Sequence, residues 1–304
     1  MRPSVVLAKL ATGAVWRLKT RTPRDGRLVP VVLCYHRVLP RSAKTRQVPE
    51  YSVTPKQFTE QMTLLNEEGF TTLSLEDYYE ATQGRRELPD RTALVTFDDG
   101  FADNYLEAWP IARRIGVNLN LFICTALVSG NTPQAFQNYS VVDQHSREEF
   151  PRHWQPLTCN QLREMATAGV GIGFHSHNHL NLGTLTSAEI TLDTSTGVTI
   201  FQQCLQRAPQ FFAFPYGHFG SYSQEAVEVL SDNGFEMFFS TELGRTQLGN
   251  ADQVISRIVI HPEDNINSFR RKLFGGYDWV GRVRRRVYAI RSSFRKPPNR
   301  LSRA

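Results

Sequence analysis

Short apolar runs alternate with helical segments along most of this chain, and this alternation constrains its fold more than any other feature. The run TALVTF, residues 92–97, is apolar or β-branched throughout, which is typical of a strand buried on both faces. Comparable runs predict further strands at residues 29–35, 70–73, 118–124, 171–176, 211–217, 236–241 and 254–260. Strands that alternate with helices favour a parallel sheet, so we expect an α/β fold, a distorted (β/α) barrel of about seven strands in a single domain.

Capping residues mark where several of the intervening helices begin. Thr54 followed by Pro55 predicts a helix that ends near residue 68, and Ser74 resembles the first residue of a capping box for the next helix. Residues 125–157 have no clear periodicity, and we expect them to cross one face of the fold as a long excursion, which is usually functional. The remaining helices are predicted at about residues 104–115, 158–168, 187–206, 223–232 and from 267 onward.

Charge is distributed unevenly along the chain. Residues 1–28 hold seven Lys and Arg against one Asp, and residues 270–304 hold twelve against one Asp, so the body between them is acidic although the net charge is +6. We therefore expect a basic N-terminal segment (1–28), a globular body (29–269) and a basic C-terminal tail (270–304). Residues 279–296 place apolar side chains among Lys and Arg, which suits an anionic membrane surface or a solvated tail equally well. No nucleic-acid-binding motif is present, so a nucleic acid is not an expected partner.

The cysteines and the N-terminal sequence bear on the cellular compartment. Cys34, Cys124, Cys159 and Cys204 are widely separated, and three of them lie in apolar stretches, where buried free thiols are the common situation and favour a reducing compartment. The N-terminal apolar stretch is interrupted by Lys9 and lacks a small-residue cleavage site. No apolar run is long enough to span a membrane. We expect a cytoplasmic location, with peripheral attachment to the inner membrane face as an option, rather than secretion.

Polar sequences follow three of the predicted strands. They are DDG at residues 98–100, HSHNH at 175–179 and PYG at 215–217. An Asp-Asp-Gly sequence alone is more often a simple turn, but core packing does not explain three of the eight histidines within five residues at a strand end. Because the active site of a barrel lies at the carboxyl ends of its strands, we expect these sequences to converge.

The residue types in these sequences suit hydrolysis assisted by a metal ion. Two histidines and a carboxylate are a usual ligand set for a catalytic Zn²⁺ with an open position, and we assign the ligands to Asp99, His175 and His179. His177 remains an alternative ligand, because alternation along an extended segment would place it on the same side. The neighbouring Asp98 points in a different direction and is predicted to take a proton from the attacking water. The expected cofactor is one divalent ion, zinc first, with cobalt, nickel and manganese as alternatives.

The sequences TFDDG at 96–100, HSxxH at 175–179 and PYG at 215–217 resemble the motifs of polysaccharide deacetylases with a NodB-homology domain, carbohydrate esterase family four. The resemblance covers roughly residues 29–265, and it implies that the body is a catalytic domain that removes N-acetyl groups from a glycan. It also implies that Asp98 is the catalytic base and that Asp99, His175 and His179 are the metal ligands. The backbone N–H of Tyr216, which follows Pro215, is the implied donor to the oxyanion.

Three other stretches resemble one branch of that family. VVLCYHRV at residues 31–38, YSVTPKQFTEQM at 51–62 and FAFPYG at 212–217 are similar to bacterial poly-N-acetylglucosamine deacetylases and enzymes of exopolysaccharide gene clusters. This resemblance implies an N-acetylated glycan or polysaccharide as the partner of the site.

Two positions depart from the family pattern. Where the third motif usually carries an Arg, this chain has Ala213; Arg257 is a candidate replacement, although an ordinary salt bridge would explain it equally well. The family's late Leu-x-His motif, whose His is the general acid, is not clearly present, and His261 is its nearest match. His36 ends the first strand, so we expect it at the same rim, where it contacts substrate or bonds a neighbouring loop.

Three functions are consistent with the sequence. The leading prediction is a metal-dependent hydrolase that removes N-acetyl groups from N-acetylhexosamine units. A glycan-binding or membrane-associated assembly protein that keeps the fold but has lost turnover is the alternative, and the missing motif Arg supports it. Hydrolysis of a non-sugar amide by the same metal site is the third.

Overall fold

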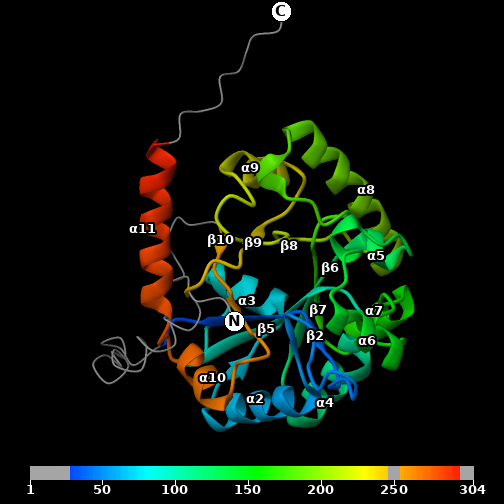
Figure 1. Ribbon diagram of the computed structural model, residues 1–304. Coiled ribbons are helices and arrows are strands. Elements are labelled where there is room, and N and C mark those ends of the chain that lie inside the picture. The colour runs from blue at the N-terminus through cyan, green and yellow to red at the C-terminus, as the bar shows by residue number, and fades with distance from the viewer. Residues whose placement is uncertain (1–27, 246–253, 295–304) are drawn as a thin grey trace, which may run out of the picture.

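The computed structural model describes residues 28–245 and 254–294, and its centre is a curled parallel sheet (Figure 1). Within these residues the sheet has nine strands in the order β10-β9-β8-β7-β6-β5-β1-β11, with β4 paired to β5. A separate small sheet pairs β2 (Arg37–Val38) with β3 (Ser52–Val53). The strands of the large sheet are β1 (Val31–Tyr35), β4 (Thr71–Thr72), β5 (Thr92–Asp99), β6 (Leu119–Ile123), β7 (Gly171–Phe174), β8 (Phe211–Ala213), β9 (Met237–Phe239), β10 (Val254–Ile255) and β11 (Ile258–Val259).

The two edge strands of the large sheet are neighbours in the sequence, so the chain itself spans the seam of the barrel. β10 pairs with β9, β11 pairs with β1, and only Ser256 and Arg257 separate the two strands. The prediction of a single strand at 254–260 is therefore wrong, because the two halves of this segment pair with different strands. The expected α/β fold with a distorted (β/α) barrel is confirmed, with nine strands in the described residues instead of about seven.

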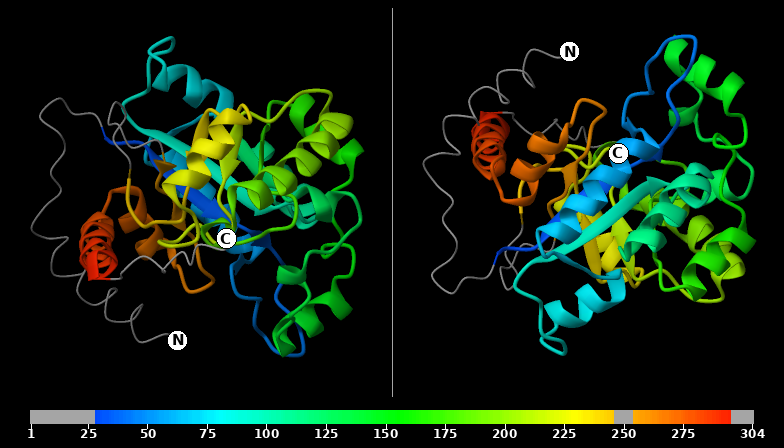
Figure 2. Two further views of the ribbon diagram at one scale, coloured as in Figure 1. Left: turned by 90° about the horizontal axis from the view of Figure 1, so that it is seen from above. Right: turned by 90° about the horizontal axis from the view of Figure 1, so that it is seen from below.

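Helices surround this sheet (Figure 2). Thr54 accepts a hydrogen bond from the Gln57 N–H in a complete capping box, and Ser74 accepts one from the Asp77 N–H, so both predicted helix starts are confirmed. The helices are α2 (Pro55–Glu67), α3 (Leu75–Thr82), α4 (Trp109–Ile115), α5 (Thr125–Val128), α6 (Val141–Glu149), α7 (Cys159–Thr167), α8 (Ser187–Leu205), α9 (Gln224–Asp232), α10 (Ile266–Leu273) and α11 (Asp278–Phe294), with a π-helical turn η1 (Asn104–Ala108) and the 3₁₀ turns η2 (Gln134–Phe136) and η3 (Leu182–Thr184).

Alternation along the strands determines which side chains enter the barrel. On β5, Val95 and Phe97 pack in the cluster that contacts the helices, whereas Leu94 packs in a second cluster inside the barrel. Asp98 continues the inward series, so its carboxylate is placed inside the barrel at the carboxyl end of the strand. On β7, a Cβ on Gly173 would lie 2.5 Å from the ring of Phe122, so only glycine leaves that ring its place.

The excursion predicted at residues 125–157 has more regular structure than its sequence suggested. It contains the short elements α5, η2 and α6, and α6 begins at Ser140 with a complete capping box. Seven of its nine residues are polar and the only buried one is Ser146, so the helix has almost no apolar face and gives only a weak periodic signal. The excursion returns to β5, where the Leu157 N–H donates to the Gly100 carbonyl, and it therefore lies beside the motif at the end of that strand.

The cysteines differ in part from the expectation of buried free thiols. Cys34 and Cys124 are free and buried, as predicted. Cys159 and Cys204 form a disulfide that joins the start of α7 to the end of α8, with 5.1 Å between the two Cα atoms. The prediction was wrong for this pair because their proximity arises from the packing of two helices 45 residues apart in sequence. Disulfides are typical of oxidising compartments, so the cysteines no longer favour a reducing one.

The C-terminal part of the chain continues the fold for two helices. Phe269 and Leu273 of α10 are fully buried, so the predicted boundary between residues 269 and 270 falls within a packed helix. α11 follows at the edge of the molecule (Figure 1). The predicted N-terminal segment 1–28 lies, except for its last residue, outside the described residues. Among the described helices, none is long and apolar enough to cross a membrane.

Candidate active site

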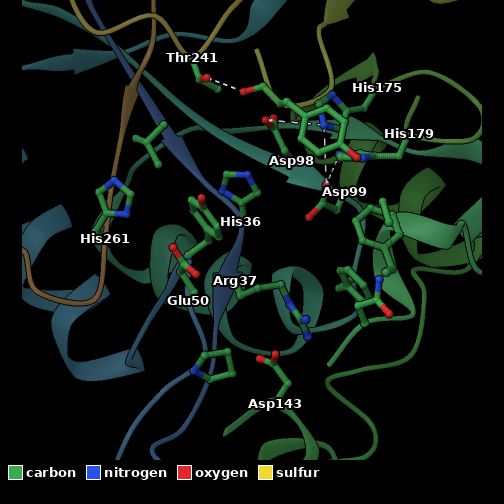
Figure 3. A pocket seen from close by; sticks show the side chains of 18 of the residues that line it. His36, Arg37, Glu50, Asp98, Asp99, Asp143, His175, His179, Thr241 and His261 are labelled. Carbon is green, nitrogen blue, oxygen red and sulfur yellow. Dashed lines mark hydrogen bonds and ion pairs between the residues drawn. The ribbon is translucent and has the colours of Figure 1, made fainter. Parts of the chain in front are cut away.

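A cleft of about 520 Å³ opens at the carboxyl ends of the barrel strands (Figure 3). The three polar sequences that were expected to converge all contribute to it. Two of the predicted site residues are not part of its lining: Arg257 lies behind Asp98 inside the barrel, and Pro215 precedes Tyr216. The predicted site residues that line the cleft are His36, Asp98, Asp99, His175, His179, Tyr216 and His261.

Asp99, His175 and His179 direct one ligand atom each to a common point. The Oδ1 atom of Asp99 lies 3.7 Å from Nε2 of His175 and 3.6 Å from Nε2 of His179. Ligand atoms at the usual distance from a tetrahedral Zn²⁺ are about 3.4 Å apart, so this spacing fits one ion. Asp99 Oδ1 is buried without a hydrogen-bond partner, which leaves it free to act as a ligand. These three residues therefore fit a divalent metal.

The partner of His175 determines which of its nitrogens can bind a metal. Its Nδ1 lies 2.7 Å from the carbonyl oxygen of Ala213, and because a carbonyl can only accept, Nδ1 carries the proton. The lone pair is then on Nε2, the atom that points toward Asp99. Ala213 thus contributes to the site through its backbone, although its side chain lacks the charge of the usual motif Arg.

Burial shifts the pKa values of the candidate ligands in directions that favour the binding of a cation. Desolvation and the adjacent Asp98 raise the pKa of Asp99 to about 8. Desolvation also lowers the pKa of His179 to about 3, so its imidazole is neutral and able to donate a lone pair. The two imidazoles are neutral and supply no positive charge. A bound cation would therefore compensate the negative charge of the buried Asp99 carboxylate.

His177, the alternative ligand, is directed away from this cluster. Its Nδ1 lies 3.0 Å from the Thr125 hydroxyl, and the side chain does not line the cleft. Alternation fails here because Ser176 and His179 have positive φ, so the segment turns instead of extending. Asp193 of α8 holds that turn by accepting hydrogen bonds from the backbone N–H groups of His177 and Asn178, a role that sequence reasoning missed. The sequence feature that could have indicated this role is that Asp193 is an acidic residue on the otherwise uncharged buried face of α8.

Arg257 forms a bidentate ion pair with Asp98. Its two terminal nitrogens lie 2.6 and 2.7 Å from the two carboxylate oxygens, and both side chains are fully buried. Arg257 also donates to the Ser240 carbonyl, which fixes the plane of the guanidinium. Although burial alone would raise it, the charge of Arg257 holds the pKa of Asp98 well below its usual range. The candidate replacement for the missing motif Arg therefore contacts the predicted base.

Cys34 is a further partner of Asp98 that sequence reasoning did not identify. Its thiol lies 3.5 Å from Asp98 Oδ2 and donates to it from the neighbouring strand β1. No motif marks this residue, since only the pairing of β1 with β5 brings the two side chains together.

The two remaining histidines lie at different places in the cleft. His36, Cys34 and Asp98 each offer a ligand atom within 4.8 Å of the others, and Nδ1 of His36 is buried without a hydrogen-bond partner. Burial lowers the pKa of His36 to about 4. The ring of Tyr51 packs against both His36, at 5.2 Å, and His261, at 5.7 Å, and His261 lies farther along the cleft (Figure 3). His36 is thus close to the predicted base, whereas His261 is at the cleft wall.

A cation held between two aromatic rings forms another part of the wall. The guanidinium of Arg37 lies 4.0 Å from the ring centre of Phe101 and 4.2 Å from that of Trp154. Its Nε also donates to Asp103, 2.6 Å away, and both side chains are buried. This arrangement fixes the excursion against β2, and no sequence motif predicted it.

Strained backbone is concentrated at the site. Asp99, Ser176, His179 and Tyr216 all have φ between 54° and 79°, the left-handed region that costs a residue with a side chain about 1–3 kcal/mol. The turn at Tyr216 is held because Thr241 donates its hydroxyl to the Tyr216 carbonyl. In the part of the chain that the structure describes, the Tyr216 N–H has no acceptor, so it is free to bind a ligand.

Comparison with known proteins shows the family to which this chain belongs. The polysaccharide deacetylase family matches residues 85–238, slightly more than half of the chain. The poly-β-1,6-N-acetyl-D-glucosamine N-deacetylase of Escherichia coli K12 is 27% identical over 80% of this chain, which spans only 38% of that longer protein. The protein of the same name from Staphylococcus aureus is 23% identical over 76% of this chain and 78% of its own length. The structure of the Streptococcus pyogenes deacetylase PplD in complex with acetate has the same fold, with a TM-score of 0.66, 20% identity, and coverage of 81% of this chain and 99% of that one. The chain therefore belongs to the polysaccharide deacetylase family, as its motifs predicted.

Proposed function

We propose that this protein is a metal-dependent hydrolase that removes N-acetyl groups from N-acetylhexosamine units of a polysaccharide or glycan precursor. The proposal depends on one observation. The buried carboxylate of Asp98, which is paired with Arg257, lies in the same cleft as three side chains that could together hold one metal ion. Family membership supports the deacetylase reaction, and the relatives named for poly-N-acetylglucosamine support the class of substrate.

Asp99, His175 and His179 would hold the metal, for which zinc is the first candidate and cobalt, nickel and manganese are alternatives. When bound, such an ion would polarise the acetyl carbonyl and make water a better nucleophile near neutral pH.

Asp98 is the proposed base. It accepts the proton of the water that attacks the acetyl carbonyl, and Arg257 keeps its carboxylate ionised and correctly oriented. The backbone N–H of Tyr216 is the proposed donor to the oxygen that becomes negatively charged.

The amine that leaves must receive a proton, and His261 is its proposed donor, because burial lowers the pKa of His36 to about 4 and leaves that imidazole neutral near pH 7. His36 lies beside Asp98 with an unpaired buried nitrogen, whereas His261 is farther along the cleft against Tyr51. His36 is the proposed substrate contact.

The alternative, a glycan-binding or assembly protein without turnover, is not favoured. Its support was the missing motif Arg, and Arg257 occupies the corresponding place beside Asp98 from a different strand segment. Nothing in the cleft favours a non-sugar amide over an acetylated sugar.

Acetate release from N-acetylglucosamine oligomers tests the proposed function. We expect a chelator to abolish it and Asp98→Asn to lower it roughly 10²- to 10⁴-fold with the metal content unchanged, because a neutral amide cannot take the proton. Asp99→Ala is the matched comparison, and it should lose the metal itself. Full activity of Asp98→Asn would contradict the role of Asp98.

A further inference from the structure

The helix α11 contributes one arginine to the catalytic cleft. Arg284 lines the cleft together with Tyr216 and Thr241, although the helix itself lies at the edge of the molecule (Figure 1). No step of the proposed reaction uses this residue, and it belongs to none of the three sequence motifs of the site. Its place in the lining therefore calls for a separate role.

Contacts of α11 with the body determine where Arg284 lies. Gly281 is so close to the Leu243 carbonyl that a side chain would not fit. The ring of Tyr288 stacks on Phe219 with 4.9 Å between ring centres. Positions 281, 284 and 288 are three and four residues apart, so they share one face of the helix. Arg284 is therefore on the face that packs against the body, between two anchored positions.

The part of the body beneath this face is joined to the turn that carries the proposed oxyanion donor. Leu243 follows Thr241 by two residues, and the Thr241 hydroxyl donates to the Tyr216 carbonyl. The Thr241 N–H also donates to the Gly217 carbonyl. Arg284 thus belongs to the same end of the cleft as the Tyr216 turn.

The two arginines that line the cleft differ in how their charge is compensated. Arg37 is paired with Asp103 at 2.6 Å and lies between the rings of Phe101 and Trp154. Arg284 is exposed, and it forms no ion pair or hydrogen bond with the other residues that the structure describes. Its positive charge is therefore available to a ligand in the cleft.

The carboxylates near this end of the cleft do not cancel that charge. Glu242, next to Thr241 in the chain, is paired with Arg285 at 3.7 Å. Two other carboxylates that line the cleft, Glu50 and Asp143, lie away from Thr241 on the opposite side (Figure 3). The end of the cleft that Arg284 borders is therefore suited to an anionic group.

We propose that Arg284 determines specificity for an anionic glycan, by binding a phosphate or carboxylate group on a sugar adjacent to the N-acetylhexosamine unit that is deacetylated. This inference rests on the proposed function and narrows its class of substrate. The guanidinium presents two parallel N–H donors that match two oxygens of either group, so both anions are recognised by the same chemistry. Because Arg284 does not act on the acetyl group, its contact strengthens substrate binding and leaves the chemical step unchanged.

Three tetrasaccharides of equal length test the proposal. One is the neutral tetramer of N-acetylglucosamine, one has a phosphate on its reducing-end sugar, and one has a glucuronic acid in place of one N-acetylglucosamine. We expect at least one anionic tetramer to have a KM roughly five- to thirtyfold below that of the neutral tetramer, at a similar kcat. This preference should decrease as salt is added, because ions screen an exposed charge. A preference for only one of the two anions identifies the group that Arg284 binds.

Two variants of Arg284 and one control separate its role from a general effect of charge. Arg284→Gln should raise the KM of the preferred anionic tetramer to the neutral value. Arg284→Lys keeps the charge without the paired donors, so it should retain part of the preference. The matched control is Arg286→Gln, which removes the same charge from an exposed position of the same helix outside the cleft lining and should retain all of it.

Calorimetric binding of the same tetramers to the full-length protein reports on Arg284 without turnover. If no tetramer releases acetate, the proposed function fails, whereas a loss of anion-dependent binding in Arg284→Gln would still support the role of Arg284. Equal affinity of the unaltered protein for all three tetramers would overturn the inference. An equal loss on all three tetramers in Arg284→Gln, or a loss of preference in Arg286→Gln as large as in Arg284→Gln, would also overturn it.

Discussion

The ion pair between Asp98 and Arg257 shows how one buried contact serves both stability and chemistry. Both side chains are removed from water, so each depends on the other for compensation of its charge. The pKa of Asp98 is lowered from 3.8, so its contribution to stability is present above that value and is lost only as the pH falls through the lower folded value.

Arg257→Met should lower the free energy of unfolding by about 3–5 kcal/mol, because it leaves the Asp98 carboxylate buried without a counter-charge. Arg257→Lys is the control: it keeps the charge but cannot bind both oxygens, so most of the stability should remain while acetate release falls. Thermal unfolding and acetate assays on both variants check this. Unchanged stability and activity of Arg257→Met would show that the pair is unimportant.

Metal binding should depend on pH through Asp99. Its pKa is raised to about 8 in the metal-free protein, so the carboxyl is protonated at neutral pH and must lose its proton when a cation binds. The affinity for zinc should therefore increase as the pH rises toward about 8, with release of about one proton per ion below that pH. Calorimetry in buffers of different ionisation enthalpy measures the proton count. Asp99→Asn should bind weakly with no such release, and a pH-independent affinity in the unaltered protein would contradict the assignment.

At the scale of elements, the split of one predicted strand into β10 and β11 determines the chemistry of the site. β10 pairs with β9 and β11 pairs with β1, so the chain crosses from one edge of the sheet to the other between these two short strands. Arg257 lies at this crossing. A side chain at the seam faces the barrel interior, which is where Asp98 ends β5. Arg257 of this late segment therefore contacts Asp98, although the resemblance led us to expect an Arg at the position of Ala213.

The disulfide between α7 and α8 gives a separate prediction about element packing. Cys159→Ser/Cys204→Ser should lower the free energy of unfolding by about 2–4 kcal/mol, because the unfolded chain regains freedom over a loop of 45 residues. Neither cysteine lines the cleft, so acetate release by the folded variant should remain. Melting temperatures with and without reductant check this. If reductant leaves the melting temperature of the unaltered protein unchanged, the bond does not contribute.

At the scale of the whole molecule, an acidic body lies between two basic ends. The candidate site is on the body, and α11, which carries part of the basic charge, borders the cleft through Arg284. A cytoplasmic location at the inner membrane face remains a prediction.

The sequence by itself determined most strands of the large sheet, the starts of the helices with a clear apolar face and the three motifs, because periodicity and capping are local properties. It also placed Asp98, Asp99, His175 and His179 at strand ends, since parallel strands present their carboxyl ends at one edge. Only the tertiary structure decided that Arg257 contacts Asp98, that His36 is nearer to it than His261, and that Cys159 meets Cys204. Each of these contacts joins residues far apart in the chain, and no local pattern records which side chains meet when the barrel curls and its helices pack.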